Sequence, residues 1–271
     1  MVSHEVLILQ SMPIRASKML RAIAKHLNVT PVSSPTDSKG WLILWGWGGR
    51  VQQAAIQSQL ARGGHVLSLD IGYFNRAKKA VRISVDSNHP QRLLKYANCD
   101  SRWKRLGIQL EDLYNEQGHI VLAGLGPKSR DLYGYSGTEF ERGVVARIKA
   151  AIPDTRIVYR PKPNNKEILD GCEDGSEGDI RQCLDGASLC VVHHSNVAVD
   201  CAIYGVPCAC VDGAGAFLYG SEIARGAGMA TRAARLDFLQ RVAWFNWEQG
   251  EEREMLRFVD SIANAEGHRF L

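Results

Sequence analysis

The feature that most constrains the fold is an apolar run at residues 187–192, which a short polar loop and a second apolar segment follow directly. The run has the length and β-branched content of a strand covered on both faces, as in the parallel sheet of an α/β domain. Ser195 and Asn196 come next and are favourable N-cap residues, so we expect a helix to begin there. Gly205 and Pro207 end that helix before another strand-like segment.

The start of this expected helix has the chemistry of an anion site. Open α/β sheets bind their ligands at the carboxyl ends of the strands, and the free amides of a helix N-terminus favour phosphate. Asp200 lies one helical turn beyond Asn196 on the same face, where a carboxylate accepts hydrogen bonds from ribose hydroxyls. The pattern indicates a nucleotide site that includes His194, Ser195, Asn196 and Asp200. The alternative is an ordinary capped helix of an α/β domain.

The overall composition is that of a soluble globular protein. The chain has 271 residues, of which 45% are hydrophobic and 23% charged, and no apolar run approaches the ~20 residues that span a bilayer. The N-terminal segment has no basic region before its short apolar stretch, so it reads as a core strand and not as a signal peptide. The seven cysteines form no Cys-x-x-Cys pair, which favours reduced thiols in the cytoplasm. A net charge of +4 permits an anionic partner without requiring one.

Strand-like and helix-like segments alternate along the whole chain, which predicts α/β architecture with mostly parallel sheets. The pattern loses its periodicity near residues 110–118 and then starts again. We therefore expect two Rossmann-like domains, at 1–115 and 116–271, with a long helical stretch at 236–263 that returns to the first domain. The expected strands are 5–10, 41–45, 65–69, 80–85, 119–123, 156–159, 187–192 and 206–211.

Two further loops of the second half follow expected parallel strands, so they should reach the same sheet edge as Ser195. Gly124 and Gly126 let the backbone approach a ligand closely, and Lys128 supplies a point charge. Arg160 and Lys162 alternate with prolines that stiffen the segment 160–164. We expect Arg160 to hold a phosphate through a bidentate contact. A basic surface loop is the alternative for this segment.

The second half, over residues 119–211, resembles the donor domain of glycosyltransferases of the two-Rossmann GT-B architecture. The resemblance rests on the glycine loop, the Arg-Pro-Lys-Pro segment and the block from His194 to Pro207. It implies that Gly124 and Gly126 lie under a nucleotide-sugar diphosphate, with Lys128, Arg160 and Lys162 supplying charge. Ser195 and Asn196 would contact phosphate, and Asp200 would hold the ribose. Many members carry Glu where this chain has Asp200, which has a shorter reach.

The first half should then present the acceptor. Trp45 and Trp47 stand among glycines after an expected strand, so their indoles can stack on a sugar or a base; burial in the domain core is the alternative. Asp70 follows the strand at 65–69, where a carboxylate can accept the proton of an attacking hydroxyl, or simply cap a turn. Tyr73 and Arg76 are candidates to orient the acceptor.

A polar stretch continues after these residues. Asp86 and His89 are rival candidates for the catalytic base. Arg76, Lys78, Lys79 and Arg82 form a local basic stretch that suits a phosphate backbone or, more commonly, a solvated face. His193 and His194 are adjacent and have no third ligand at a suitable spacing, so we expect no metal site.

The sequence therefore predicts a metal-independent, cytoplasmic GT-B-like hexosyltransferase without a cofactor, which uses a nucleotide sugar, most plausibly linked to UDP. The chain is similar to small phage-type proteins of this architecture, which would place it in the host cytoplasm. That similarity and the basic stretch favour a hydroxymethylated pyrimidine in double-stranded DNA as acceptor, flipped out of the duplex. The alternatives are a surface polysaccharide or lipid-linked saccharide acceptor, a sugar-nucleotide epimerase, and a non-catalytic DNA-binding protein. The oligomeric state is not predicted.

Overall fold

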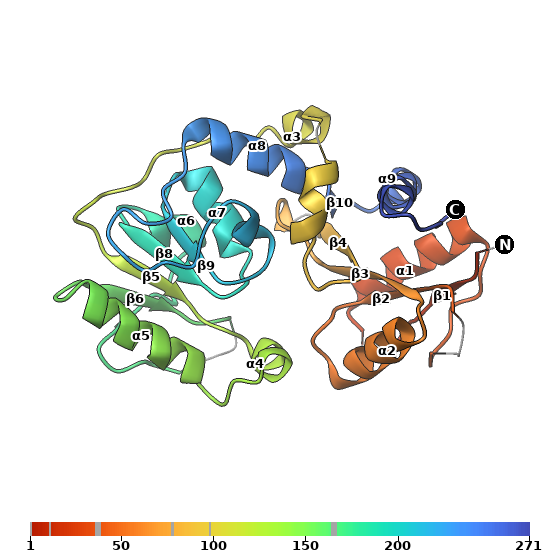
Figure 1. Ribbon diagram of the computed structural model, residues 1–271, viewed down its shortest axis with the longest axis horizontal. Helices are drawn as coiled ribbons and strands as arrows, with labels where there is room; N and C mark the ends of the chain where they lie inside the picture. The colour runs from red at the N-terminus through yellow and green to blue at the C-terminus, as the bar shows by residue number, and fades with distance from the viewer. Residues whose placement is uncertain (1, 11, 36–38, 77–78, 98, 164–166) are drawn as a thin grey trace. The chain divides into compact units, whose positions relative to one another are not determined.

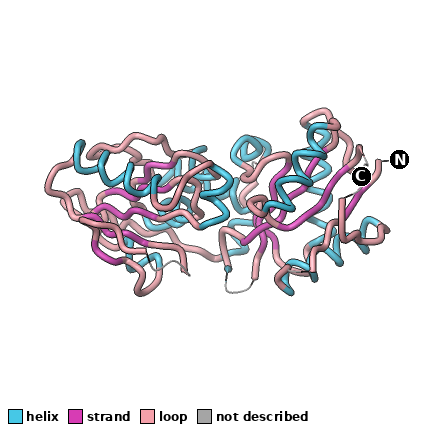
Figure 2. The backbone as a smooth tube through the Cα atoms, turned by 90° about the horizontal axis from the view of Figure 1, so that it is seen from below, coloured by secondary structure: helices cyan, strands magenta, loops and turns pink. Residues whose placement is uncertain are grey.

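The computed structural model describes residues 2–10, 12–35, 39–76, 79–97, 99–163 and 167–271. The chain forms two compact units: residues 1–99 together with 241–271, and residues 100–240. Within each unit, helices lie on both sides of a five-stranded sheet (Figures 1 and 2). The predicted class, α/β with two Rossmann-like domains, is confirmed. The division differs from the expected one, because it falls at residue 99 and returns the C-terminal segment to the first unit.

The sheet of unit 1 has the strand order β1-β2-β3-β4-β10. Strands β1 (His4–Val6), β2 (Trp41–Trp45) and β3 (His65–Ile71) are parallel, whereas β4 (Val81–Val85) runs antiparallel to β3 and β10 (Asn246–Trp247) antiparallel to β4. Leu7 bridges Val32 on the free side of β1, so the chain changes direction between β1 and β2. This is the switch point of a doubly wound sheet.

Alternation along β2 explains how unit 1 is layered. Leu42 and Leu44 join a core cluster with Ala55 and Ile56 of α2 (Arg50–Ala61). Side chains alternate between the two faces of a strand, so Trp41 lies on the face of β2 opposite to Leu42 and Leu44. Its ring packs edge-on against that of Phe270, with 4.8 Å between the ring centroids. The remaining helices of the unit are α1 (Ile14–Leu27), the 3-10 helix η2 (Gln91–Tyr96) and α9 (Glu252–Ala265), and α1 packs against α9.

The expected long helical stretch at 236–263 is interrupted in the structure. Helix α8 (Arg232–Ala243) ends first, and Asn246 and Trp247 then pair with β4 as strand β10. Gly250 follows at φ +100°, a conformation that breaks a helix, and α9 begins at Glu252. The prediction of one continuous helix was wrong because pairing with a distant strand leaves no local signal. The return of this segment to the first unit is confirmed.

The sheet of unit 2 is parallel throughout, with the order β7-β6-β5-β8-β9. Its strands are β5 (Ile120–Ala123), β6 (Ile157–Arg160), β7 (Glu173–Asp174), β8 (Leu189–Val192) and β9 (Cys208–Cys210). The chain fills the β5-β6-β7 side first and then crosses to β8 and β9. The switch point therefore lies between the carboxyl ends of β5 and β8.

The helices of unit 2 connect these strands. They are α3 (Ser101–Leu106), α4 (Pro127–Tyr133), α5 (Glu139–Ala151), α6 (Ile180–Leu184), α7 (Val197–Tyr204), the 3-10 helix η3 (Ala214–Phe217) and most of α8. Because right-handed crossovers run in opposite directions from the switch point, α5 and α7 cover opposite faces of the sheet. The face under α5 holds a continuous apolar core that includes Phe140, Val144, Ile148, Leu122 and Val191.

Candidate nucleotide site of unit 2

Two of the predicted loops flank the switch point of unit 2. The glycine loop follows β5, and the loop of His193 and His194 follows β8. Ligands of doubly wound sheets bind at this position, where diverging loops leave a crevice beyond the strand ends. The topology therefore places the predicted residues where such a fold binds ligands.

Gly124 has a close neighbour that requires a glycine, whereas Gly126 has only an ordinary contact. A Cβ at Gly124 would stand 2.6 Å from the hydroxyl of Tyr159, a collision that only glycine avoids. A Cβ at Gly126 would meet Cγ of Lys162 at 3.6 Å, so the Lys162 side chain lies over this glycine. Gly126 also precedes the first turn of α4, which carries Lys128 as an exposed cation.

Lys162 joins the β6 and β8 loops. Its Nζ donates a hydrogen bond to Oγ of Ser195 at 3.2 Å, and the same oxygen accepts a bond from the backbone amide of Val197 at 3.3 Å. Asn196 occupies the N-cap position of α7. The structure thus brings Gly126, Lys162 and Ser195 together at one point. Their role in binding a donor remains a prediction. Asn164, at the end of the Lys162 segment, lies outside the described residues.

Asp200 lies in the first turn of α7 and is 6% exposed. Tyr204 is one turn further on, and burial followed by the charge of Asp200 raises the pKa of its phenol. The predicted ribose contact requires one carboxylate oxygen to reach the crevice. That role stays a prediction.

Arg160 binds backbone carbonyls in the structure, whereas the sequence predicts that it binds a phosphate. Its Nη1 donates to the carbonyls of Gly175 and Glu177 at 2.6 and 3.2 Å, and its Nη2 donates to the carbonyl of Gly178 at 2.9 Å. In this arrangement the guanidinium fastens the segment after β7 to the end of β6. A phosphate would have to compete with three carbonyls that already occupy the donors, so the geometry favours a structural role over the predicted bidentate contact.

His193 and His194, which precede Ser195, form a cluster with Tyr133 and Asp212, two residues that the sequence analysis did not single out. Tyr133 at the end of α4 donates to Oδ2 of Asp212 at 2.5 Å, and its ring lies 4.2 Å from that of His193 and 5.0 Å from that of His194. His193 is 4% exposed, and burial lowers its pKa although the nearby Asp212 opposes the shift. Tyr133 and Asp212 are 79 positions apart, so no spacing motif could have paired them.

In unit 1, Asp70 is the penultimate residue of β3 and carries an accessible carboxylate. Its side chain is 33% exposed, and its Oδ2 accepts from Nη2 of Arg82 at 3.1 Å. The antiparallel pairing places Arg82 directly opposite Asp70. Tyr73 is 2% exposed and lies 6.0 Å from the Arg82 guanidinium, and Arg76 is half-buried. Burial keeps the Tyr73 side chain from contacting an acceptor directly, which does not favour its predicted role in orienting the acceptor.

The tryptophans belong largely to the core of unit 1. Trp45 is 8% exposed, and the Arg15 guanidinium lies 5.5 Å from its ring. Trp47 packs against the cluster of Leu42, Leu44 and Ile56. These positions favour the core interpretation over the predicted stacking surface.

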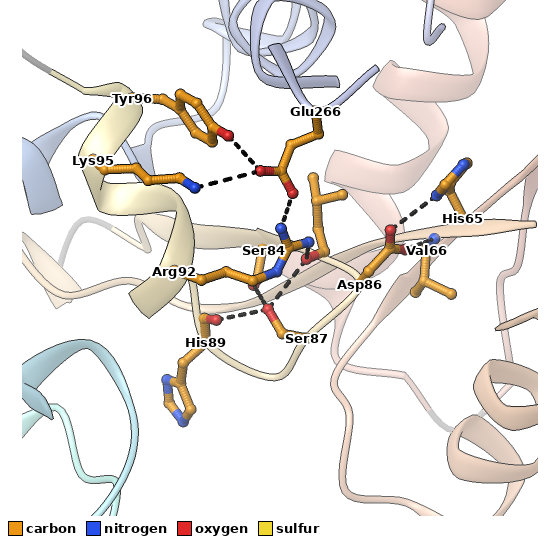
Figure 3. Close-up of polar contacts among 11 residues, drawn as sticks. His65, Val66, Ser84, Asp86, Ser87, His89, Arg92, Lys95, Tyr96 and Glu266 are labelled. Carbon is orange, nitrogen blue, oxygen red and sulfur yellow. Dashed lines mark hydrogen bonds and ion pairs between the residues drawn. The ribbon is translucent and has the colours of Figure 1, made fainter. Parts of the chain in front are cut away.

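Asp86 is separated from Asp70 by the length of β3. Since β4 runs antiparallel to β3, its end meets the start of β3, where Asp86 accepts from His65 at 2.9 Å and from the Val66 amide at 2.7 Å. Figure 3 shows this pair, with the His89 ring pointing away from it. The pairing with His65 makes Asp86 a structural residue at the opposite sheet edge, so it does not compete with Asp70. Lys78 of the predicted basic stretch lies outside the described residues.

Among the described residues, no group of three or more His, Cys, Asp or Glu side chains is arranged to hold a metal ion. No helix in the described part of the chain is both long and apolar enough to cross a bilayer.

Comparison of the fold identifies a class of similar structures. Among solved structures similar to this chain are two transferases, each of which it matches over more than nine-tenths of both chains. One is the β-Kdo 2,7 transferase of Thermosulfurimonas dismutans KpsC, with a TM-score of 0.58 and 14% sequence identity, covering 96% of this chain and 99% of that one. The other is the β-Kdo 2,4 transferase of the same KpsC, with a TM-score of 0.50 and 12% identity, covering 91% and 92%.

No protein-family model matches the sequence, and no curated protein matches it either. At these identities the two structures show a shared fold.

Proposed function

We propose that this protein is a glycosyltransferase that uses a nucleotide-activated sugar. The observation that carries the proposal is the meeting of Gly126, Lys162 and Ser195 at the switch point of unit 2. A cation and a hydroxyl beside a glycine loop at this edge suit a phosphate group. The likeness to two transferases over nearly the whole chain supports the same reading.

In this proposal unit 2 binds the donor, and Lys162 stabilises negative charge on the departing nucleotide. Ser195 and the first amides of α7 bind phosphate, and Asp200 binds the ribose. No metal is needed for this charge stabilisation. Unit 1 supplies the acceptor side, where Asp70 accepts the proton of the attacking hydroxyl. Arg82 orients the Asp70 carboxylate through the 3.1 Å ion pair.

We favour a saccharide acceptor over DNA. The DNA prediction gave the indoles the task of stacking on a flipped base, and this support is weakened because Trp45 is buried and Trp47 packs on the core. The two similar transferases are described as acting with Kdo, an acidic sugar, and a surface saccharide acceptor is the corresponding choice. A hydroxymethylpyrimidine in DNA is the second candidate acceptor. UDP is one of several nucleotides to be tested as the carrier of the donor sugar.

The experiment is a turnover assay with nucleotide sugars linked to UDP, GDP, ADP and CMP, including CMP-linked Kdo. Each donor is offered with oligosaccharide, with hydroxymethylated duplex DNA, and with no acceptor. Product that depends on the oligosaccharide supports the proposal, and Asp70→Asn should abolish it while donor binding persists. Sugar conversion without acceptor would indicate an epimerase. Salt-dependent DNA binding without turnover would indicate a DNA-binding protein.

A further inference from the structure

A fully buried carboxylate holds the middle of the glycine loop. Glu141 on α5 is 0% exposed, and its Oε1 accepts from the backbone amide of Leu125 at 2.8 Å. Leu125 lies between Gly124 and Gly126, so this bond fixes the loop at its centre. A charged side chain buried in this way is costly unless it is paired and has a defined task.

Arg130 of α4 supplies the pairing charge. Its Nη2 donates to the same Glu141 oxygen at 3.1 Å and to Oε2 of Glu167 at 2.9 Å, and its side chain is 10% exposed. Burial by itself acts to lower the pKa of Arg130, but the hydrogen bonds that its guanidinium donates to Glu167 and Glu141 outweigh burial and raise that pKa. The guanidinium therefore remains a cation between two carboxylates.

The contacts of Arg130 extend from the support of the glycine loop to Glu167. Glu141 and Arg130 act on the glycine loop through Leu125, and Glu167 belongs to the segment that follows Lys162. The Glu141–Arg130–Glu167 triad thus links the glycine loop to Glu167, which lies five positions after Lys162 in the sequence.

Tyr159 completes the support on the sheet side. It is 2% exposed, and its ring and hydroxyl occupy the space that a side chain at Gly124 would need. Burial, followed by the charge of Glu141, raises its pKa to about 12, so it stays a neutral phenol. Tyr159 therefore limits position 124 to glycine, and the charged pair fixes the Leu125 amide.

We infer that Glu141 is a positioning residue for the nucleotide donor, which sets the glycine loop against Lys162 through its bond to the Leu125 amide and its ion pair with Arg130. This inference rests on the proposed function. Groups that bind phosphate act well only when their supporting residues fix them to within a fraction of an ångström. Removal of Glu141 frees the loop amide and leaves Arg130 without its buried partner.

The test compares Glu141→Gln and Glu141→Leu with a matched control, Glu139→Gln, which changes an exposed carboxylate on the same helix. Glutamine retains an oxygen that can accept from Leu125, whereas leucine retains neither the acceptor nor the charge. Dissociation constants for the preferred nucleotide sugar are measured by calorimetry well below the unfolding midpoint of each variant. Donor and acceptor KM values are measured alongside.

We expect Glu141→Leu to weaken donor binding by about tenfold or more, as for the loss of a hydrogen bond to a charged group. Glu141→Gln should fall between wild type and Glu141→Leu, and Glu139→Gln should bind as wild type. The donor KM should rise while the acceptor KM does not. Should Glu141→Leu fail to fold, Glu141→Gln decides by comparison with Glu139→Gln.

Unchanged donor affinity in the folded Glu141 variants, even with lowered stability, would overturn the inference and leave Glu141 a purely structural residue. That result is distinct from failure of the proposed function, in which the wild-type protein itself would bind none of the nucleotide sugars.

Discussion

Lys162 Nζ donates a hydrogen bond to Ser195 Oγ at 3.2 Å across the end of β5, because β6 and β8 flank that strand in the sheet. The side chain passes over Gly126 on the way. This one contact places a cation above the glycine loop and beside the start of α7. It is the most direct structural support for an anion site in unit 2.

Replacing Lys162 by methionine should therefore weaken binding of a nucleotide sugar by about tenfold or more, since a charge-assisted hydrogen bond to phosphate is lost. The unfolding midpoint should change little, because the remaining partner of Ser195 is the Val197 amide. Calorimetric titration measures the effect. Lys149→Met, which removes an exposed charge from α5 of the same unit, is the control. Equal losses in both variants would show that Lys162 acts only through net charge.

Arg160→Ala should reduce stability more than nucleotide affinity. The substitution removes the donors that bind the carbonyls of Gly175, Glu177 and Gly178, at a cost of about 1–2 kcal/mol in the free energy of unfolding. Urea unfolding measures this cost. Arg156→Ala, which breaks only a surface pair with Glu173, should cost less. Lost nucleotide binding with unchanged stability would instead restore the phosphate contact that the sequence predicts.

Gly124→Ala should destabilise unit 2 by about 1–3 kcal/mol, because its methyl group would stand 2.6 Å from the Tyr159 hydroxyl. Tyr159→Phe removes that oxygen and should recover part of the loss in the double variant. Thermal unfolding of the four proteins of this cycle gives the interaction energy. Additive effects of the two substitutions would show that the collision is relieved elsewhere.

Glu266 should make the stability of unit 1 dependent on pH in the acidic range. Tyr96 donates to its carboxylate, as does Arg92, and these bonds lower the pKa of Glu266 from 4.5 in spite of partial burial (Figure 3). Because the pKa of Glu266 is lower in the folded protein, the unfolded chain binds more protons than the folded protein does as the pH falls. The stabilisation is therefore present above pH 4.5 and is lost as pH decreases through the lowered pKa.

Glu266→Gln tests this directly by urea unfolding at pH 7 and at progressively lower pH. The variant should be less stable than wild type at pH 7, and the difference should shrink in acid. A difference that stays constant with pH would mean that the carboxylate contributes through packing and not through its charge.

The elements around the candidate site could be predicted well from local sequence. The run ending in Val192 has the composition of a buried strand, and Ser195, Asn196 and Gly205 mark the limits of a helix observed at Val197–Tyr204. Such signals are local, because capping and β-branching act within a few residues. The meeting of Lys162 with Ser195 follows from the parallel order of strands, which the alternation of elements predicts.

The parts that could not be predicted depend on pairing between distant segments. Asp86 lies at the opposite end of β3 from Asp70 because β4 runs antiparallel to β3. The sequence between the two strands does not show whether they pair parallel or antiparallel. The bond between Tyr133 and Asp212 and that between Glu141 and Leu125 are likewise tertiary. Glu141, in the first turn of a helix, has the sequence context of an exposed charge, yet it is fully buried.

The central claim is that unit 2 binds a nucleotide sugar through Lys162 and Asp200. The most direct measurement is thermal stabilisation of the wild-type protein by UDP, GDP, ADP, CMP and their sugar conjugates, with Lys162→Met and Asp200→Ala in parallel. A ligand present at 100 times its dissociation constant adds about 2.7 kcal/mol to the free energy of unfolding. The account predicts a clear shift with one nucleotide family that is lost in both variants. No shift with any of these ligands, or a shift that both variants retain, would contradict it.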